Sequence, residues 1–207
     1  AAALNEEQLS AVRSVSPKIA VAAGPGTGKT KTLVSRILYL LENRKVKPSE
    51  ITAVTFTNQA AREMKTRLEH QLGKKPIVNK IRIGTFHSIS MEQLKAAGEK
   101  FILAEESAAL ELVREVAEEL GIGENPKRLR QKISQRKIEA AEGKGDGGWE
   151  GQERLKVNQA ATRYQERLAA MAAYDFDDLL IKALKMAQEG ATSFPYLLVD
   201  EFQDINP

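Results

Sequence analysis

The sequence contains no cysteine, few aromatic residues and no long apolar run. Without cysteine the chain can form neither a disulfide nor a thiolate metal site, which fits a reducing compartment. No apolar run approaches the length of a bilayer span, and no basic region followed by an apolar stretch marks the N-terminus, so we expect no membrane partner and no secretory signal. The net charge of +3 is too small for the overall balance to predict a polyanion partner. These absences predict a cytoplasmic protein. Its partners have to be inferred from local patterns in the sequence.

The composition that remains is that of a soluble globular protein. Hydrophobic residues make up 42% of the 207 positions and charged residues 29%, which is ordinary for such proteins. A chain of this length can bury a substantial core and corresponds to one or two domains.

A glycine-rich turn near the start of the chain carries the strongest chemical signal. An apolar run over residues 19–22 leads into the turn, which ends at Gly28-Lys29-Thr30 and opens a helical pattern. The N–H groups of such a turn can cradle phosphates at a helix N-terminus. Lys29 is then placed to reach the β- and γ-phosphates, and the Thr30 hydroxyl to coordinate Mg²⁺. The strict pattern has glycine where this chain has Ala23. A plain turn with a capping threonine is the alternative, but it leaves the lysine and the glycines unexplained.

A short helix is predicted just before this turn. Residues 4–12 have a helical pattern, and Asn5 is a suitable N-cap. Gln8 lies in this helix, upstream of the predicted phosphate loop. Its amide could donate to and accept from an adenine edge, and an ordinary surface position is the alternative.

Two further strand-then-helix patterns follow the turn. Buried strands are predicted over residues 51–56 and 81–86, and each leads into a helix, the first of which runs through about Leu72. Successive units of this kind favour a parallel sheet with right-handed crossovers. Ligands bind such sheets at the carboxyl ends of the strands, where this chain carries polar and aromatic residues at 56–58 and 85–88.

The stretch from about residue 101 to residue 173 has a different character. Helical periodicity dominates it and strand signals are absent, so we expect an all-helical insertion in the sheet domain. A basic run inside it could track the phosphates of duplex DNA. Alternatively the run is a solvated face, or it pairs with the acidic helix before it. The basic run consists of Lys127, Arg128, Arg130, Lys132, Arg136 and Lys137.

The sheet pattern returns towards residue 207. A helix is predicted to start at Asp175, and a later apolar run delivers Asp200 and Glu201 at its end. An acidic strand end is the expected partner of a phosphate loop, because one carboxylate holds hydrated Mg²⁺ beside Thr30 and the second polarises the attacking water. Acids in this position can also be simple helix caps.

Six short motifs, in this order, resemble those of the superfamily 1 DNA helicases of the UvrD/Rep/PcrA type. The motifs are Leu4-Asn-x-x-Gln8, Ala23-Gly-Pro-Gly-Thr-Gly-Lys-Thr30, Thr55-Phe-Thr-Asn-Gln-Ala-Ala-Arg-Glu-Met64, Gly84-Thr-Phe-His-Ser88, Asp175-Phe-Asp-Asp-Leu179 and Asp200-Glu-Phe-Gln-Asp204. The resemblance covers nearly the whole chain apart from parts of the helical stretch. It implies an α/β fold, a RecA-like P-loop NTPase parallel sheet with an all-helical inserted subdomain. The sheet domain, 1A, would comprise residues 1–98 and 174–207, and the helical subdomain, 1B, residues 99–173.

The resemblance also implies ATP and Mg²⁺ as cofactors and a role for each matching residue. Thr30 and Asp200 would hold the metal, Glu201 would be the general base, and Gln203 would couple the nucleotide state to DNA. The implied catalytic residues are Lys29, Asp200, Glu201 and Gln203. The implied nucleotide-binding residues are Gln8, Ala23, Gly24, Gly26, Thr27, Gly28, Lys29, Thr30 and Lys31. The residues that match the family's single-stranded DNA track are Phe56, Asn58, Thr85, Phe86 and His87.

Some of these positions admit another interpretation or depart from the family pattern. Without the resemblance, Phe56 and Phe86 would be assigned to ordinary core packing and His87 to a helix cap. Gln59 stands where a lysine is frequent. Lys31 stands where an arginine often packs on the adenine, a contact for which lysine lacks the planar guanidinium.

The function implied for the longer protein is ATP-driven movement on single-stranded DNA in the 3′ to 5′ direction. Because the sequence stops just after the acidic strand, we expect a piece of a longer helicase, with C-terminal helicase domains as partners and little turnover by the piece itself. Two alternatives remain open. One is a helicase subunit of a helicase–nuclease complex, and the other is a non-catalytic DNA-binding or partner-docking module that acts through the helical stretch and could contact duplex DNA.

Overall fold

The computed structural model describes residues 4–22, 28–73, 75–144, 148–190 and 194–201. These residues divide into two compact units, one that ends at Ile89 and resumes after residue 191, and one over Ser90–Ala191. We call them the sheet unit and the helical unit. None of the helices in the described ranges combines the length and the apolarity of a membrane span.

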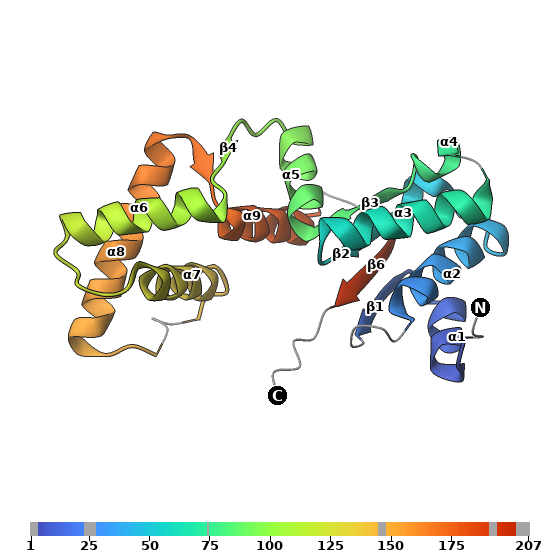
Figure 1. The fold of residues 1–207 in the computed structure, drawn as a ribbon, viewed down its shortest axis with the longest axis horizontal. Helices are drawn as coiled ribbons and strands as arrows, with labels where there is room; N and C mark the ends of the chain where they lie inside the picture. Colours follow the sequence, from blue (N-terminus) through green and yellow to red (C-terminus); the bar gives the residue numbers. More distant parts are fainter. Residues whose placement is uncertain (1–3, 23–27, 74, 145–147, 191–193, 202–207) are drawn as a thin grey trace. The chain divides into compact units, whose positions relative to one another are not determined.

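The sheet unit is built on four parallel strands in the order β1-β6-β2-β3 (Figure 1). The strands are β1 Lys18–Ala22, β2 Ile51–Thr55, β3 Arg82–Thr85 and β6 Tyr196–Glu201. The last strand of the chain therefore lies between the first two, and it pairs with both. This arrangement confirms the predicted α/β class with a parallel sheet, because each connection returns the chain in the same direction.

Helices connect and cover the strands of this sheet. The helices are α1 Glu6–Arg13, α2 Lys29–Glu42, α3 Asn58–Leu72, α4 Lys75–Val78 and the start of α5 Phe86–Ala96, with a 3₁₀ turn at Pro48–Glu50. The apolar residues of α2 recur at helical spacing and enter the core together with Ile51, Met64, Leu68 and Leu198. Thr57 is the N-cap of α3, and its hydroxyl accepts a hydrogen bond from the Ala60 N–H at 3.1 Å.

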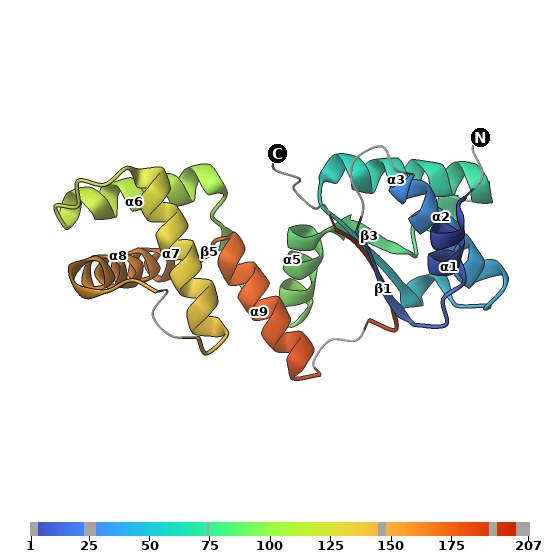
Figure 2. The ribbon, with the colours of Figure 1, turned by 90° about the horizontal axis from the view of Figure 1, so that it is seen from below.

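The helical unit contains a second core formed by three helices (Figure 2). These are α6 Glu106–Glu119, α7 Pro126–Ala141 and α8 Gly151–Ala170, and α9 Phe176–Gln188 follows them. Val113, Ile133 and Leu168 are fully buried between the three helices. The helix predicted from Asp175 is confirmed, because Asp175 is the N-cap of α9 and its side chain accepts a hydrogen bond from the Asp178 N–H.

One expectation for the helical stretch was wrong in detail. Residues 101–173 were expected to contain no strand, but Ile102–Leu103 (β4) pairs in parallel with Ala173–Tyr174 (β5). Hydrogen bonds from Ile102 N–H to the Ala172 carbonyl, at 2.9 Å, and from Ala104 N–H to the Tyr174 carbonyl, at 2.8 Å, extend the ladder. Two-residue strands are too short to show the alternation by which strands are predicted.

Candidate nucleotide and nucleic-acid sites

The register of the sheet brings the predicted motifs to one edge. Asp200 of β6 pairs with Val21 of β1, and Thr55 of β2 pairs with Thr85 of β3. Because Val54 pairs with Val199, the next residues along, Thr55 and Asp200, lie at the same level of neighbouring strands. All four strands are parallel, so these residues share the carboxyl edge of the sheet, where ligands bind in folds of this kind.

Lys29 and Asp200 meet at this edge as a buried ion pair. The Lys29 Nζ atom lies 2.7 Å from Asp200 Oδ1, and the two side chains are only 11% and 7% exposed. Lys29 is the first residue of α2, so its side chain starts at the helix N-terminus. The sequence predicted that both residues act at one site, and the structure brings them into contact.

The Asp200 carboxylate is a ligand type that fits a divalent cation. Its Oδ1 atom is buried and lies 2.7 Å from the Lys29 ammonium. A cationic group therefore already lies against this oxygen, in a place that a divalent cation could take. Mg²⁺ prefers carboxylate and hydroxyl oxygens and usually takes only one or two protein ligands beside phosphates. Asp200, with Thr30 in the first turn of α2, therefore fits a magnesium–nucleotide complex.

A metal ion bound here would have few protein ligands, namely Asp200 and Thr30. Within the part of the chain that the structure describes, no group of three or more acidic or histidine side chains could hold a metal ion. A structural metal site is therefore not found there, whereas a site completed by the phosphates of a nucleotide needs no such group.

Several predicted residues lie outside the described ones. These are Ala23, Gly24, Gly26, Thr27 and Gln203, and Glu201 is described only by its place as the last residue of β6. The structure therefore does not test the roles predicted for them.

Gly28 and Gln8 lie against each other where the turn enters α2. Gly28 has φ +79°, a left-handed conformation that favours glycine. A Cβ atom at Gly28 would lie 3.2 Å from Gln8 Nε2. The predicted adenine-reading residue is therefore next to the end of the predicted phosphate loop, and Lys31 lies in the first turn of α2.

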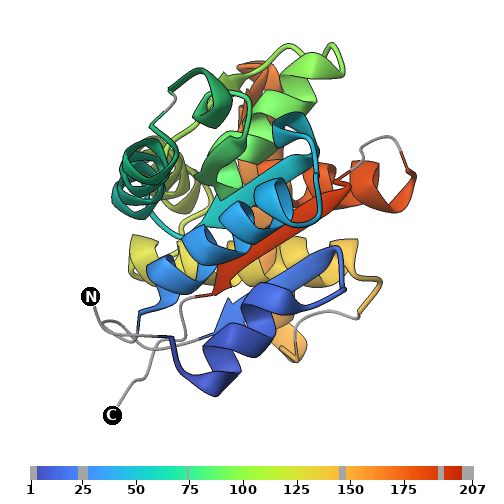
Figure 3. The same ribbon diagram turned by 90° about the vertical axis from the view of Figure 1, so that its right-hand side faces the viewer.

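A buried arginine outside the predicted motifs, Arg36, holds α1 on α2. The two helices lie side by side in Figures 2 and 3. Arg36 Nη1 donates to the carbonyls of Val12, at 2.9 Å, and of Ser14, and Nη2 donates to the carbonyl of Ser16 at 2.7 Å. Burial lowers the pKa of Arg36 from its ordinary value. The sequence feature that could have indicated this role is a basic residue on the apolar face of a helix.

Exposed aromatic and polar residues follow β2 and β3. Phe56 is 67% exposed and Phe86 is 40% exposed, and each comes directly after one member of the Thr55–Thr85 pair. Neighbouring strands lie about 4.8 Å apart, so the two rings start from adjacent positions of the edge. Core packing, the other interpretation of these rings, is excluded by their exposure.

The polar members of the predicted DNA set lie at the same strand ends. Asn58 begins α3, and His87 lies in the first turn of α5; both are exposed. The Thr85 hydroxyl accepts a hydrogen bond from the Ser88 N–H at 3.2 Å. The Thr85 oxygen thus helps to hold the start of α5, and this bond does not use the O–H donor of the hydroxyl.

Gly84 allows α5 to start close to the sheet. A Cβ atom there would lie 2.6 Å from Ser88 Oγ and 3.3 Å from Ile89 Cγ1. The Ser88 hydroxyl cannot simply move away, because it donates to the Thr85 carbonyl at 3.0 Å. Glycine at this position is therefore explained by packing.

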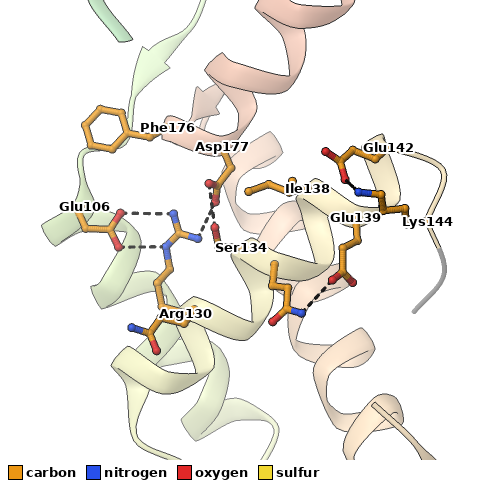
Figure 4. A pocket seen from close by; sticks show the side chains of 11 residues that line it. Glu106, Arg130, Ser134, Ile138, Glu139, Glu142, Lys144, Phe176 and Asp177 are labelled. Carbon is orange, nitrogen blue, oxygen red and sulfur yellow. Dashed lines mark hydrogen bonds and ion pairs between the residues drawn. The ribbon is translucent and has the colours of Figure 1, made fainter. Parts of the chain in front are cut away.

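Most of the basic run in the helical unit has partners within the unit, and Figure 4 shows those of Arg130. Arg130 lies between Glu106 and Asp177, with Nη1 2.9 Å from Asp177 Oδ2. The other pairings are Lys132 with Glu124 and Glu153, Lys137 with Asp175 and Asp178, and Arg136 Nε donating to Asn158. Lys127 and Arg128 are exposed at the start of α7. Pairing with the acidic helix before the run, one of the alternatives left open, is seen for Arg130 with Glu106. The partners given above for Lys132, Arg136 and Lys137 come from other segments of the unit.

Asp175 is the centre of a buried charge cluster in this unit. Its side chain accepts a hydrogen bond from Tyr164 Oη at 2.8 Å and contacts Lys137 Nζ at 2.9 Å. Burial works to raise the pKa of Asp175, but Lys137 and the hydrogen bonds outweigh it, so the pKa lies below the ordinary value. Burial and the charge of Asp175 raise the pKa of Asp178 instead, and burial raises that of Tyr164.

A cavity of about 600 Å³ also lies in the helical unit, beside α7. Arg130, Glu106 and Asp177 line it together with Ile138 and Lys144 (Figure 4). None of the residues predicted to bind nucleotide or single-stranded DNA lines this cavity.

The chain is similar to known proteins over nearly its full length. The family model described as "UvrD/REP helicase N-terminal domain" matches residues 4–207. The chain is 33% identical to the ATP-dependent DNA helicase PcrA of Bacillus subtilis, over 98% of this chain and 30% of that protein. It is 31% identical to the probable DNA helicase II homolog of Mycoplasma capricolum, over 98% of this chain and 31% of that protein. With the putative ATP-dependent DNA helicase YjcD of Bacillus subtilis it shares 31% identity, over 99% and 29% of the two chains. The chain thus spans about 30% of the length of these relatives.

Proposed function

The chain belongs to the UvrD/REP helicase N-terminal domain family, and from this we propose that it is the nucleotide-binding part of an ATP-dependent helicase that moves along single-stranded DNA. The observation that carries this proposal is the buried contact between Lys29 and Asp200 on the edge that also bears Phe56 and Phe86. Relatives that carry the name ATP-dependent DNA helicase support it. We propose a 3′ to 5′ direction by analogy with the family.

We propose that the sheet forms the RecA-like domain 1A, over residues 1–98 and 174–207, and that residues 99–173 form the inserted subdomain 1B. The β4–β5 ladder supports limits close to these, since it ties residues 102–103 to residues 173–174, although the compact helical unit is wider and extends over Ser90–Ala191. A helical insertion whose two ends are hydrogen-bonded together can be accommodated in a sheet domain without separating the strands on either side of it.

Lys29 would exchange one anion for another when nucleotide binds. It would leave the Asp200 carboxylate, 2.7 Å away, and pair with the β- and γ-phosphates. Asp200 and Thr30 would hold Mg²⁺, which when bound neutralises phosphate charge. Glu201, the next residue of β6, would take the proton of the attacking water, and Gln203 would relay the nucleotide state to DNA.

Phe56 and Phe86 would provide stacking faces for successive bases. Base–aromatic stacking contributes about 1–3 kcal/mol per base and does not depend on sequence, which suits a protein that must move along any strand. Asn58 and His87 would contact the DNA backbone beside them, since polar side chains commonly hold phosphates and sugars. Thr85 would contribute mainly by fixing the start of α5.

We propose that this 207-residue chain binds Mg–ATP but hydrolyses it slowly. Sites of this kind are completed by groups from a second domain or partner, and one arginine supplied in this way can raise turnover 10³–10⁵-fold. A DNA-stimulated hydrolysis rate comparable to that of complete helicases would contradict this part of the proposal.

Binding of single-stranded DNA tests the proposed track. Alanine at Phe56 or at Phe86 should weaken binding of a short oligonucleotide to the 207-residue chain by about fivefold or more, as expected for the loss of one stacked base. Leu155→Ala is the matched control, because Leu155 is 60% exposed but lies on α8. Equal affinities for the three variants and the wild type would contradict the proposed track.

A further inference from the structure

The hydroxyl group of Thr55 forms a hydrogen bond across the turn that carries Phe56. Thr55 is the last residue of β2, and it is buried, with 1% of its surface exposed. Its Oγ1 atom donates to the Thr57 carbonyl at 3.1 Å. The bond joins the residues on either side of Phe56, so it restrains the main chain of Phe56 from both directions.

The acceptor of this bond, Thr57, is itself fixed to the start of α3. Its carbonyl also accepts a hydrogen bond from the Ala61 N–H at 3.1 Å, and its hydroxyl accepts one from the Ala60 N–H at 3.1 Å. A carbonyl oxygen has two lone pairs, and here one serves the helix and the other serves Thr55. The Thr55 hydroxyl therefore links the end of β2 to the first turn of α3.

The same hydroxyl lies close to the strand that leads to the second exposed ring. Its oxygen is 3.4 Å from the carbonyl oxygen of Gly84 on β3, two residues before Phe86. A hydroxyl group has a single proton to donate, so the shorter contact with Thr57 is the stronger of the two. Of the two rings, Phe56 is thus the one that the Thr55 hydroxyl restrains most directly.

This restraint bears on how well Phe56 can stack on a base. A ring that is already held near its binding position loses little conformational freedom when a ligand binds, and such preorganisation increases affinity. A restrained main chain fixes the direction in which the exposed side chain of Phe56 starts. Loss of the Thr55 hydroxyl would release this restraint without changing the chemistry of the ring.

We propose that Thr55 is a positioning residue for the stacking of a nucleic-acid base on Phe56. This inference rests on the proposed single-stranded DNA track. Thr55 is buried and needs no contact with the DNA. Its hydroxyl acts on binding through the main chain on either side of Phe56.

The test measures the affinity of the 207-residue chain for a fluorescent oligothymidine by anisotropy. Thr55→Val keeps the β-branched shape of the side chain but removes the hydroxyl. It should weaken binding about threefold, a part of the effect expected for one stacked base. Thr55→Ser keeps the hydroxyl and should restore most of the wild-type affinity.

Thr32→Val is the matched control for the loss of a buried hydroxyl. Thr32 is also 1% exposed, and its hydroxyl donates to the main-chain carbonyl of Gly28 at 3.1 Å. The two valine variants should therefore unfold at similar temperatures. Thr32→Val should nevertheless bind the oligothymidine as the wild type does, which separates a loss of stability from a loss of positioning.

A double-mutant cycle with Phe56→Ala tests whether Thr55 acts through the ring. If it does, Thr55→Val should have no further effect on oligothymidine affinity once the ring has been removed, because the two residues act as one unit. A merely structural role would leave the two effects independent, and they would multiply in the double variant.

The outcomes distinguish the inference from its premise. If Phe56→Ala weakens binding but Thr55→Val does not, or if the two effects multiply, the role of Thr55 is overturned and the proposed track stands. If the wild-type chain and Phe56→Ala bind the oligothymidine equally, or neither binds it, the place of Phe56 in the track is wrong and the inference is overturned with it.

Discussion

At the residue scale, the contact between Lys29 and Asp200 makes metal and nucleotide binding interdependent. Lys29 is held by a buried carboxylate, so a metal-free nucleotide must compete with Asp200 for the lysine and leaves that carboxylate without a counter-ion. A buried charge without a partner is costly. The Mg²⁺ complex avoids this cost, because the cation can take the place of the lysine.

Replacing Asp200 by asparagine should therefore have opposite effects on the two forms of the nucleotide. Affinity for ATP in the presence of a chelator should rise by about tenfold, equivalent to about 1.4 kcal/mol, whereas affinity for Mg–ATP should fall. Calorimetric titration of both variants measures the effect. Asp177→Asn, which removes a carboxylate paired with Arg130 in the helical unit, should change neither affinity. If Asp200→Asn binds metal-free ATP as the wild type does, or more weakly, then Asp200 does not compete with the nucleotide for Lys29.

Alanine substitutions at Gly28 and Gly73 can distinguish the cost of backbone strain from the effect of a local side-chain contact. Both have positive φ, +79° and +60°, so alanine should cost about 1–2 kcal/mol of folding free energy at either one. Only at Gly28 would the new Cβ meet Gln8 Nε2, at 3.2 Å, whereas at Gly73 no atom of the described residues outside its chain neighbours lies within 4 Å. Gly28→Ala should thus lower nucleotide affinity and Gly73→Ala should not. Equal affinities in the two variants would argue against a role for the Gly28–Gln8 contact.

At the scale of elements, the strands and helices of the sheet unit follow from local patterns. The apolar runs, the caps at Asn5 and Thr57 and the left-handed Gly73 after α3 give the expected boundaries. Local patterns could not give the rest. Phe56 resembles a core residue, because an apolar side chain at a strand end does not reveal its exposure. Arg36 binds main-chain carbonyls more than twenty residues away, which no periodicity encodes.

Arg36→Met should undock α1 from α2. Three carbonyls would lose their donor, and the expected loss is about 2–4 kcal/mol of unfolding free energy for the sheet unit. Amide hydrogen exchange should accelerate in α1 before it does so in the strands. Arg67→Met is the control, since Arg67 makes only an exposed pair with Glu63 on α3, which contributes little. Similar amide hydrogen exchange in α1 of both variants would contradict the role of Arg36 in holding α1 on α2.

The charge cluster of the helical unit should make its stability depend on pH. The folded pKa of Asp175 is lowered, so its stabilising contribution is fully present above the ordinary aspartate pKa near 4 and is lost as the pH falls through the folded value. Asp178 acts in the opposite sense, because its pKa is raised and the folded state binds that proton more tightly than the unfolded state.

Asp175→Asn should accordingly destabilise the helical unit by about 3–5 kcal/mol at pH 7, as for a broken buried ion pair. The difference from the wild type should stay constant between pH 5 and 8 and shrink below pH 4. Urea denaturation followed by the fluorescence of Trp149, the sole tryptophan of the chain, measures it within this unit. A difference that grows on acidification would contradict the direction of the pKa shift.

At the scale of the whole molecule, one edge of one sheet carries both the proposed nucleotide site and the proposed DNA track. β6 lies between β1 and β2, so the strand with Asp200 touches the strand that leads to the phosphate loop and the strand that leads to Phe56. A conformational change at the proposed nucleotide site thus has to be transmitted across only one strand to reach the proposed DNA track. The order of strands, which the sequence does not reveal, creates this adjacency.

The central claim, that this chain binds Mg–ATP at the Lys29–Asp200 site, is tested most directly by a calorimetric titration. The wild-type chain should bind Mg–ATP saturably, and Lys29→Ala should bind it at least tenfold more weakly, because the lysine is the group that pairs with the phosphates. Lys144→Ala, which removes an exposed lysine of the helical unit, should match the wild type. An affinity of Lys29→Ala equal to that of the wild-type chain would contradict the account.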